Sequence, residues 1–314
     1  MRNIFKVERA IKNMQEAVPK VLPPLPDSLQ SMDGSSIKRK YYNLVKYYGG
    51  KYDKLPQILH YIELVAQENN ATTFLECFGG GGKCILNIDA INNHFEKKIY
   101  NELDIGMCSL FRMASTTATA QELINELNQF EHSKEIFKYC KKHRYDEDLS
   151  DLYRACLIFM LCQMGYNSST KDYSKFHEDD LSFYNAINRI AYAPDHLRDV
   201  EIVNGDYKDL MKKYGADSTA VKYLDPPYHP ICRNQGALNI YTNELTQQQH
   251  REMVNLLCQS KSWILSGYDP AQWGCTDYEP LEKAGAVKVC IGKYVVSALN
   301  RNANYKEEYI WYKI

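Results

Sequence analysis

The stretch TTFLECFGGGGKCIL, residues 72–86, joins a short apolar segment directly to four consecutive glycines. The apolar segment predicts a buried β-strand, and the residues after the glycines predict a helix over residues 83–93. A glycine-rich turn between a strand and a helix is where the backbone of an open α/β sheet can approach a nucleotide-like ligand closely. A tight turn that binds nothing would have the same sequence, so the stretch alone predicts a fold and not a ligand.

The rest of the chain alternates between strand-like and helical segments. This alternation predicts an α/β fold with an open, mostly parallel sheet and helices on both faces. A block that is almost entirely helical interrupts the pattern and predicts an inserted subdomain over residues 119–194. Residues 1–40 are predicted to form an N-terminal helix and a linker. The further strand-like segments are KKIYNEL, VEIVN, AVKYLD, SWILSG, AVKVCIG and EEYIWYKI.

Composition excludes several classes of protein. The chain has 314 residues, 45% of them hydrophobic, so it can bury a large core. Its 38 Lys and Arg against 39 Asp and Glu argue against a protein that coats nucleic acid by charge alone. The ten cysteines stand without metal-binding spacing, so we expect no metal site and a reducing compartment. No apolar run is long enough to span a bilayer and no signal peptide is visible, which predicts a cytoplasmic protein without a membrane partner.

A second stretch, AVKYLDPPYHP at residues 220–230, predicts chemistry. An exocyclic amine on a base is a poor nucleophile because its lone pair is delocalised into the ring. The Asp225 carboxylate and the Pro226 carbonyl can accept the amine hydrogens, so that the nitrogen becomes pyramidal and directs its lone pair outward. The rings of Pro226 and Pro227 fix the backbone, and Tyr228 offers a face for an extruded base. The competing interpretation is a strand that stops at a rigid turn.

The second predicted strand ends in an acid, Glu102, placed to accept hydrogen bonds from ribose hydroxyls. Together with the glycines it indicates a nucleoside cofactor, and NAD and S-adenosylmethionine both fit. A phosphate-binding loop of the Walker type is disfavoured because Cys84 follows Lys83 where Ser or Thr would be required.

The motifs in their order resemble a known family. LDPPY with ECFGGGG upstream resembles the amino-methyltransferases that use S-adenosylmethionine. The fuller set resembles the alpha class of N6-adenine DNA methyltransferases, related to the bacterial DNA adenine methylase, over roughly residues 41–314. The other matching segments are KYYGGK (46–51), YNELD (100–104), NGDYKDL (204–210), YTNELTQQQHREMVNLL (241–257) and SGYD (266–269).

The resemblance implies a Rossmann-like methyltransferase fold whose catalytic domain comprises residues 41–118 and 195–314. It implies that residues 119–194 are a helical target-recognition insert. It also implies S-adenosylmethionine as cofactor, no metal, and double-stranded DNA as the partner, methylated at N6 of adenine in a specific sequence.

Carried over by motif, the resemblance assigns roles to individual residues. The target adenine is assigned to Asp225, Pro226, Pro227 and Tyr228. Lys51 would meet the methionine carboxylate, Glu102 the ribose and Asp206 the cofactor adenine, although Asp206 also suits the N-cap of a helix. The full set implied for the cofactor is Tyr47, Lys51, Glu76, Phe78, Gly80, Gly82, Glu102, Asp206, Tyr207 and Asp225.

The chain departs from the family pattern at a few positions. Cys77, Tyr48 and Glu102 replace a proline, an alanine and the more common aspartate, and none of them removes the needed chemistry. Ser168 stands where the insert usually has glycine, which weakens any inference about the recognised sequence. The same chemistry on cytosine N4 or on adenine in RNA, and a DNA-binding relic without activity, remain alternatives. The sequence does not predict the recognition site, a restriction-modification, phage or orphan role, the oligomeric state or the role of residues 1–40.

Overall fold

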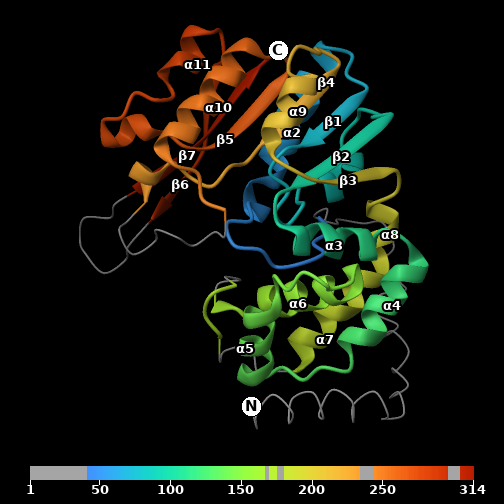
Figure 1. Ribbon diagram of the computed structural model, residues 1–314. Helices are drawn as coiled ribbons and strands as arrows, with labels where there is room; N and C mark the ends of the chain where they lie inside the picture. Colours follow the sequence, from blue (N-terminus) through green and yellow to red (C-terminus); the bar gives the residue numbers. More distant parts are fainter. Residues whose placement is uncertain (1–40, 167–169, 175–179, 234–242, 296–304) are drawn as a thin grey trace, which may run out of the picture.

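The computed structural model describes residues 41–166, 170–174, 180–233, 243–295 and 305–314 (Figure 1). The predicted N-terminal helix and linker over residues 1–40 lie outside these ranges, as does Ser168. Within the described ranges no helix is both long and apolar enough to cross a membrane.

A seven-stranded sheet with the order β3-β2-β1-β4-β5-β7-β6 organises the fold. The five strands β3, β2, β1, β4 and β5 are parallel to one another, and β7 runs antiparallel to both β5 and β6. This confirms the predicted mostly parallel sheet. The strands are β1 (Thr73–Glu76), β2 (Lys97–Glu102), β3 (Val200–Asn204), β4 (Ala220–Leu224), β5 (Trp263–Tyr268), β6 (Val287–Val295) and β7 (Tyr305–Lys313).

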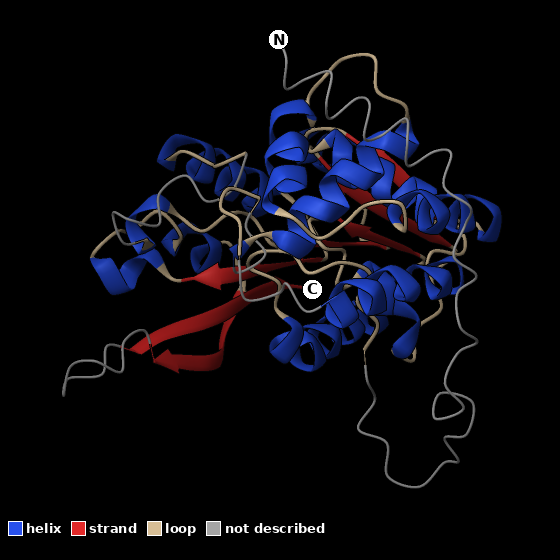
Figure 2. Cartoon of the chain, turned by 90° about the horizontal axis from the view of Figure 1, so that it is seen from below, coloured by secondary structure: helices blue, strands red, loops and turns tan. Residues whose placement is uncertain are grey.

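Both faces of the sheet are covered by helices, as predicted. Side chains alternate along each strand, so Phe74 and Leu75 of β1 enter two different hydrophobic clusters. The Phe74 side is covered by α2 (Leu55–Glu68) and α3 (Ile105–Ala114). The other side is covered by α9 (Tyr207–Tyr214), α10 (Gln247–Gln259) and α11 (Glu279–Lys283). Figure 2 shows the strands running between these two layers of helices.

A block of helices separates β2 from β3 along the chain. In Figure 1, α5, α6 and α7 lie together away from the sheet, and α3 lies between them and the strands. Helix α6 is the centre of this block, because ten consecutive residues, 155–164, are buried. The range 119–194 for a target-recognition insert stays a prediction. The α-helices between α3 and β3 are α4 (Thr117–Leu127), α5 (Lys134–His143), α6 (Asp151–Met164), α7 (Asp180–Arg189) and α8 (Ala193–His196).

The helix predicted over residues 83–93 is shorter and tighter than expected. The structure has only a 3₁₀ helix, η3 (Ile85–Ala90). Its first N–H groups bond to a side chain, since the Glu76 carboxylate accepts from Cys84 and Ile85. Asn87 is held by the Tyr42 backbone, which donates its N–H at 2.7 Å and accepts from the amide at 2.9 Å. These tertiary bonds to another segment decide the conformation, and the local sequence pattern does not show them.

The strand order places a crevice between the ends of β1 and β4. From β1 the chain moves outward to β2 and β3, and then returns to β4 on the opposite side of β1. In open α/β sheets ligands bind at this switch of direction, beyond the carboxyl ends of the strands. The glycine loop after β1 and the Asp-Pro-Pro-Tyr turn after β4 therefore lie side by side.

Candidate active site

A pocket lies at this switch point, between the glycine loop, the turn after β4 and residues 47–51. Eight of the residues predicted for the site line it, namely Tyr47, Lys51, Glu76, Phe78, Gly80, Asp225, Pro226 and Tyr228. Gly82, Glu102, Asp206, Tyr207 and Pro227 are not part of the lining. The structure thus brings together motifs that are far apart in the chain, since Lys51 and Asp225 are separated by 174 positions.

The glycine loop has a conformation that requires glycine at several positions. Gly80 and Gly82 have φ values of 47° and 61°, in the left-handed region that other residues rarely adopt. Gly79, which was not among the predicted residues, is restricted by space, because a Cβ there would lie 2.3 Å from the Tyr100 ring. Its N–H donates to the Asn101 carbonyl at 2.7 Å, which ties the loop to β2.

The carboxyl groups of Glu76 and Glu102 accept hydrogen bonds from backbone N–H groups in and directly after the glycine loop. Glu76 is buried and accepts the N–H of Ile85 at 2.7 Å and that of Cys84 at 3.3 Å. Burial raises the pKa of Glu76 to about 8, although these two hydrogen bonds oppose the shift. Glu102 accepts the N–H of Gly80 at 2.7 Å, and burial raises its pKa as well. Both acids therefore position the backbone that forms the wall of the pocket.

Asp206 lies at the start of α9 and caps it, accepting the N–H of Lys208 at 2.9 Å. Its side chain is exposed, so the cap leaves it accessible to a ligand. The next residue, Tyr207, packs its ring on Phe78 with centroids 4.6 Å apart. The cap interpretation of Asp206 is therefore confirmed, and its predicted contact with a cofactor stays a prediction.

The Asp225 carboxylate has one oxygen engaged and one available. Oδ1 accepts from Lys51 Nζ, and from Ser266 Oγ at 3.2 Å. No donor reaches Oδ2 from the described residues, and a quarter of the side chain (24%) is exposed. Burial raises the pKa of Asp225, whereas the Lys51 charge lowers it. Asp225 lines the pocket, so the site holds a carboxylate with one bonded oxygen and one that no described donor reaches.

Tyr228 is fixed by three neighbours. Its ring stacks on Tyr268 at 4.2 Å, and Lys51 Nζ lies 5.0 Å from its centroid. Its hydroxyl donates to Glu308 Oε1 at 3.2 Å. Glu308 comes from β7 and was missed by the sequence analysis, as were Tyr268 and Ser266. The pairing of β5 with β7 places Glu308 opposite Tyr268, and no local motif indicates that contact.

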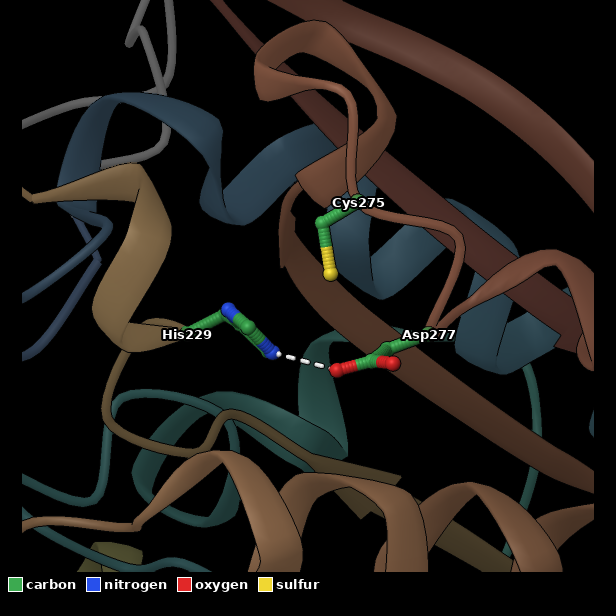
Figure 3. Close-up of side chains that lie close together, drawn as sticks. All are labelled: His229, Cys275 and Asp277. Atoms are coloured by element: carbon green, nitrogen blue, oxygen red, sulfur yellow. Dashed lines mark hydrogen bonds and ion pairs between the residues drawn. The ribbon is translucent and has the colours of Figure 1, made fainter.

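His229, directly after the turn, belongs to a hydrogen-bonded network (Figure 3). Its Nε2 donates to Asp277 Oδ2 at 3.1 Å, and its Nδ1 accepts the N–H of Ile231. Burial lowers the pKa of His229, and the hydrogen bond to Asp277 partly opposes this. The neutral His229 ring therefore connects the end of the turn to Asp277, in the segment after β5, by a hydrogen bond.

The same network contains one group with metal-ligand atoms, formed by His229, Cys275 and Asp277 (Figure 3). The Asp277 oxygens are already engaged by Arg251 at 2.9 Å and by Gln247 at 2.9 Å. The His229 nitrogen that faces the acid carries the proton in the tautomer set by Ile231. The Arg251 guanidinium is itself a cation, and a ring nitrogen that carries a proton cannot bind a metal. The group therefore suits a hydrogen-bond network better than a metal site.

The sheet order, the glycine loop after β1 and the acidic turn after β4 together define a Rossmann-like methyltransferase fold. Residues 47–269 match the family model of the D12 class N6 adenine-specific DNA methyltransferases, so the chain belongs to this family. This confirms the resemblance to adenine-specific DNA methyltransferases that the motifs indicated.

Individual relatives support the assignment. The chain is 24% identical to a DNA adenine methylase of Salmonella typhi over 262 residues, which is 80% of this chain and 88% of the relative. It is 23% identical to a DNA adenine methylase of Escherichia coli (strain K12) over 225 residues, covering 69% and 76% of the two chains. A DNA N-6-adenine-methyltransferase of Escherichia phage P1 is 22% identical over 230 residues, 68% of this chain and 28% of the relative.

Proposed function

We propose that this protein transfers a methyl group from S-adenosylmethionine to N6 of an adenine that is rotated out of double-stranded DNA. The observation that carries the proposal is that the two carboxylate oxygens of Asp225 differ in their hydrogen bonds. Lys51 and Ser266 hold Oδ1, while Oδ2 remains available beside Pro226 at the pocket wall. That arrangement suits a group that must accept hydrogen bonds from an amine.

The residues of the turn would act on the amine and not on the methyl group. The Asp225 carboxylate and the Pro226 carbonyl accept the two amine hydrogens, which draws the nitrogen out of conjugation and frees its lone pair. The sulfonium of S-adenosylmethionine supplies an electrophilic methyl, and the electrons of the broken carbon–sulfur bond stay on sulfur. The extra proton on the methylated nitrogen then leaves to Asp225 or to water. Positioning and hydrogen bonding carry this catalysis.

Two features of the pocket support S-adenosylmethionine as the donor. The glycine backbone at Gly80 packs closely against Tyr47, since a Cβ there would lie 2.9 Å from the Tyr47 ring, and both residues line the pocket. Lys51 is a buried cation that can face the methionine carboxylate. We assign the remaining contacts to the residues implied by the motifs, with Glu102 toward the ribose and Asp206 toward the adenine of the donor. The other members of this set are Glu76, Phe78, Gly82, Tyr207 and Asp225.

Tyr228 would stack on the extruded adenine. Stacking of a base on an aromatic ring contributes about 1–3 kcal/mol and helps repay the cost of unstacking the base from the duplex. The ring is held in place on its Tyr268 side. Pro226 and Pro227 keep the backbone between it and Asp225 rigid, so the two contacts on the base are held at a fixed separation.

We place recognition of the DNA sequence in the helical insert, residues 119–194, and in the loop over residues 229–240. Residues 41–118 and 195–314 form the catalytic domain in this proposal, and the enzyme acts in the cytoplasm. A restriction-modification role is compatible with the phage relative.

The decisive experiment offers the purified protein labelled S-adenosylmethionine and unmethylated duplex DNA. We expect label in N6-methyladenine, with no incorporation into the same duplex after full methylation at the recognised sequence. Mapping the modified positions by sequencing then gives the recognition site. Label in cytosine, or transfer to RNA alone, would contradict the proposal.

A further inference from the structure

Lys51 lies between two carboxylates that come from different parts of the chain. One is Asp225, whose Oδ1 bonds to Lys51 Nζ. The other is Glu308 of β7, whose Oε1 lies 3.4 Å from the same nitrogen. The side chains of Lys51 and Glu308 are 5% and 2% exposed, so water screens their interaction very little.

Glu308 also reaches the other functional side chain of the turn. Its Oε1 accepts the hydroxyl of Tyr228 at 3.2 Å, so a single carboxylate oxygen serves both Tyr228 and Lys51. A buried carboxylate is costly unless it is paired and hydrogen-bonded. Here both partners belong to the proposed site, which links Glu308 to that site.

We propose that Glu308 is a positioning residue for methyl transfer. It shares the charge of Lys51 with Asp225 and anchors the hydroxyl of Tyr228. Asp225 thereby keeps more of its negative charge for the amine hydrogens, and the Tyr228 ring keeps its angle to the base. The inference rests on the proposed function and adds to it a residue that no sequence motif of the site contains.

The proposal has an electrostatic consequence at Asp225. The titratable groups around this carboxyl are Lys51, Glu308, Glu76, Cys84, Tyr223 and Tyr228. Burial raises the pKa of Asp225, Lys51 lowers it, and the Glu308 charge raises it. Asp225 accepts amine hydrogens only when ionised, so activity falls as the pH drops through its pKa. Removing the Glu308 charge lowers this pKa, and the acidic limb of the pH profile then moves to lower pH.

The test compares Glu308→Gln with the wild type in steady-state kinetics on duplex DNA at saturating S-adenosylmethionine. The substitution keeps the shape of the side chain and removes its charge. We expect kcat to fall about tenfold or more, because Lys51 then neutralises Asp225 alone. We expect the acidic limb of kcat/KM for DNA to move down by about half a pH unit or more. The dissociation constant of S-adenosylmethionine, measured by calorimetry, reports whether the pocket has folded.

Two variants sharpen the result. Glu307→Gln changes the neighbouring acid, whose carboxylate accepts from the Tyr309 hydroxyl, and should leave kcat and the acidic limb as in the wild type. Glu308→Asp keeps the charge but shortens the side chain, so kcat should fall while the limb stays in place. This variant decides the question if the Gln variant does not bind the cofactor.

The outcomes separate the inference from the proposed function. If the wild type methylates adenine and Glu308→Gln loses activity with an unmoved acidic limb, or loses none, the inference is wrong while the proposed function stands. Glu308→Asp keeps the negative charge, so it should leave the acidic limb of the pH profile in place. If this variant moves the limb as far as Glu308→Gln is expected to, the shift does not come from the Glu308 charge and the inference is wrong. If the wild type does not methylate adenine at all, the proposed function is wrong and the inference with it.

Discussion

The glycine loop after β1 and the turn after β4 line the same pocket, yet they are built differently. The loop contributes mainly backbone, and its shape depends on what is missing, since a Cβ at Gly79, Gly80 or Gly82 would meet a ring within 3 Å. The turn contributes mainly side chains, and its shape depends on two proline rings. The loop's conformation is held by Glu76 and Glu102, which accept hydrogen bonds from backbone N–H groups, whereas the turn is held by ion pairs and stacking.

The difference separates two kinds of consequence. A change in the loop alters the shape of the pocket, so it should affect stability and cofactor binding together. In the proposed function, a change in the turn alters a charge or a ring beside the reacting amine, so it should affect turnover while the fold persists. Each prediction below tests one side of this distinction.

The largest effect is expected from Asp225→Ala, which removes the acceptor in the turn. Turnover should fall by about 100- to 1000-fold or more, because the amine loses a preorganised acceptor. Lys51 keeps Glu308 as a partner, so cofactor binding should remain measurable. Single-turnover transfer of labelled methyl and calorimetry with S-adenosylmethionine measure the two effects.

Asp209→Ala changes an exposed acid on α9 that is paired with Lys212. This variant is the control and should keep full turnover. An Asp225→Ala variant with near-normal turnover would show that the acceptor is misassigned.

Gly79→Ala tests the loop with the smallest possible addition. The new Cβ would lie 2.3 Å and 2.5 Å from atoms of the buried Tyr100 ring, so the loop or the ring must move. We expect a loss of about 1–3 kcal/mol in the free energy of unfolding and a clear loss of cofactor affinity. Denaturant unfolding and calorimetry measure both.

Gly205→Ala is the matched control for that substitution. The nearest side-chain atom to its added Cβ is Asn101 Oδ1 at 3.6 Å, an ordinary contact. Its stability should stay within about 0.5 kcal/mol of the wild type. Equal behaviour of the two alanine variants would contradict the claim that the loop's shape depends on Gly79.

Glu76 gives the loop a pH dependence. Its pKa is raised by burial to about 8, so the folded state holds a proton that the unfolded state releases above about pH 4.5. The stability that this group contributes is therefore fully present below that pH and is lost as the pH rises to 8. The slope is at most about 1.4 kcal/mol per pH unit.

The measurement compares the unfolding free energy of the wild type with that of Glu76→Gln across this window. We expect the advantage of the wild type to shrink with rising pH, because Gln cannot ionise. Glu122→Gln, at an exposed position of α4, is the control for the substitution itself. A difference that grows with pH would mean that the ionised form of Glu76 is the one the fold prefers.

The fold could be predicted from the sequence because its determinants are local and periodic. Alternating strands and helices gave the sheet, and the motifs LDPPY and FGGGG marked the ends of β4 and β1. Local pattern failed at residues 83–93, where Tyr42 and Glu76 bond to the chain and leave only a 3₁₀ helix.

The sequence could indicate residues that line the pocket where a motif names them, and not where the tertiary structure adds contacts to them. Asp225, Tyr228 and Lys51 were predicted because they stand in recognisable segments, and the structure brings them together in one pocket. Glu308 reaches them through the antiparallel pairing of β7 with β5, which places it opposite Tyr268. Gly79 was missed for a similar reason, since its constraint is the Tyr100 ring on the neighbouring strand.

The smallest effect is expected at Asp206, which joins the two kinds of role in one residue. Its carboxylate caps α9, and its exposed position leaves it available to the donor adenine in the proposed function. Asp206→Asn keeps a capping oxygen, whereas Asp206→Ala removes it and should cost about 1 kcal/mol of stability. Both substitutions remove the charged acceptor, so both should weaken S-adenosylmethionine binding to a similar, modest degree.

The pair therefore separates the cap from the ligand contact by thermal unfolding and calorimetry. Normal cofactor affinity in the Asn variant, with a loss only in the Ala variant, would mean that Asp206 acts through the helix alone. If the Asn and Ala variants lose the same cofactor affinity but differ in stability, the Asp206 carboxylate contributes to binding independently of its role as a helix cap. The two variants thus apply the distinction between shape and chemistry to a residue that caps a helix outside the lining of the pocket.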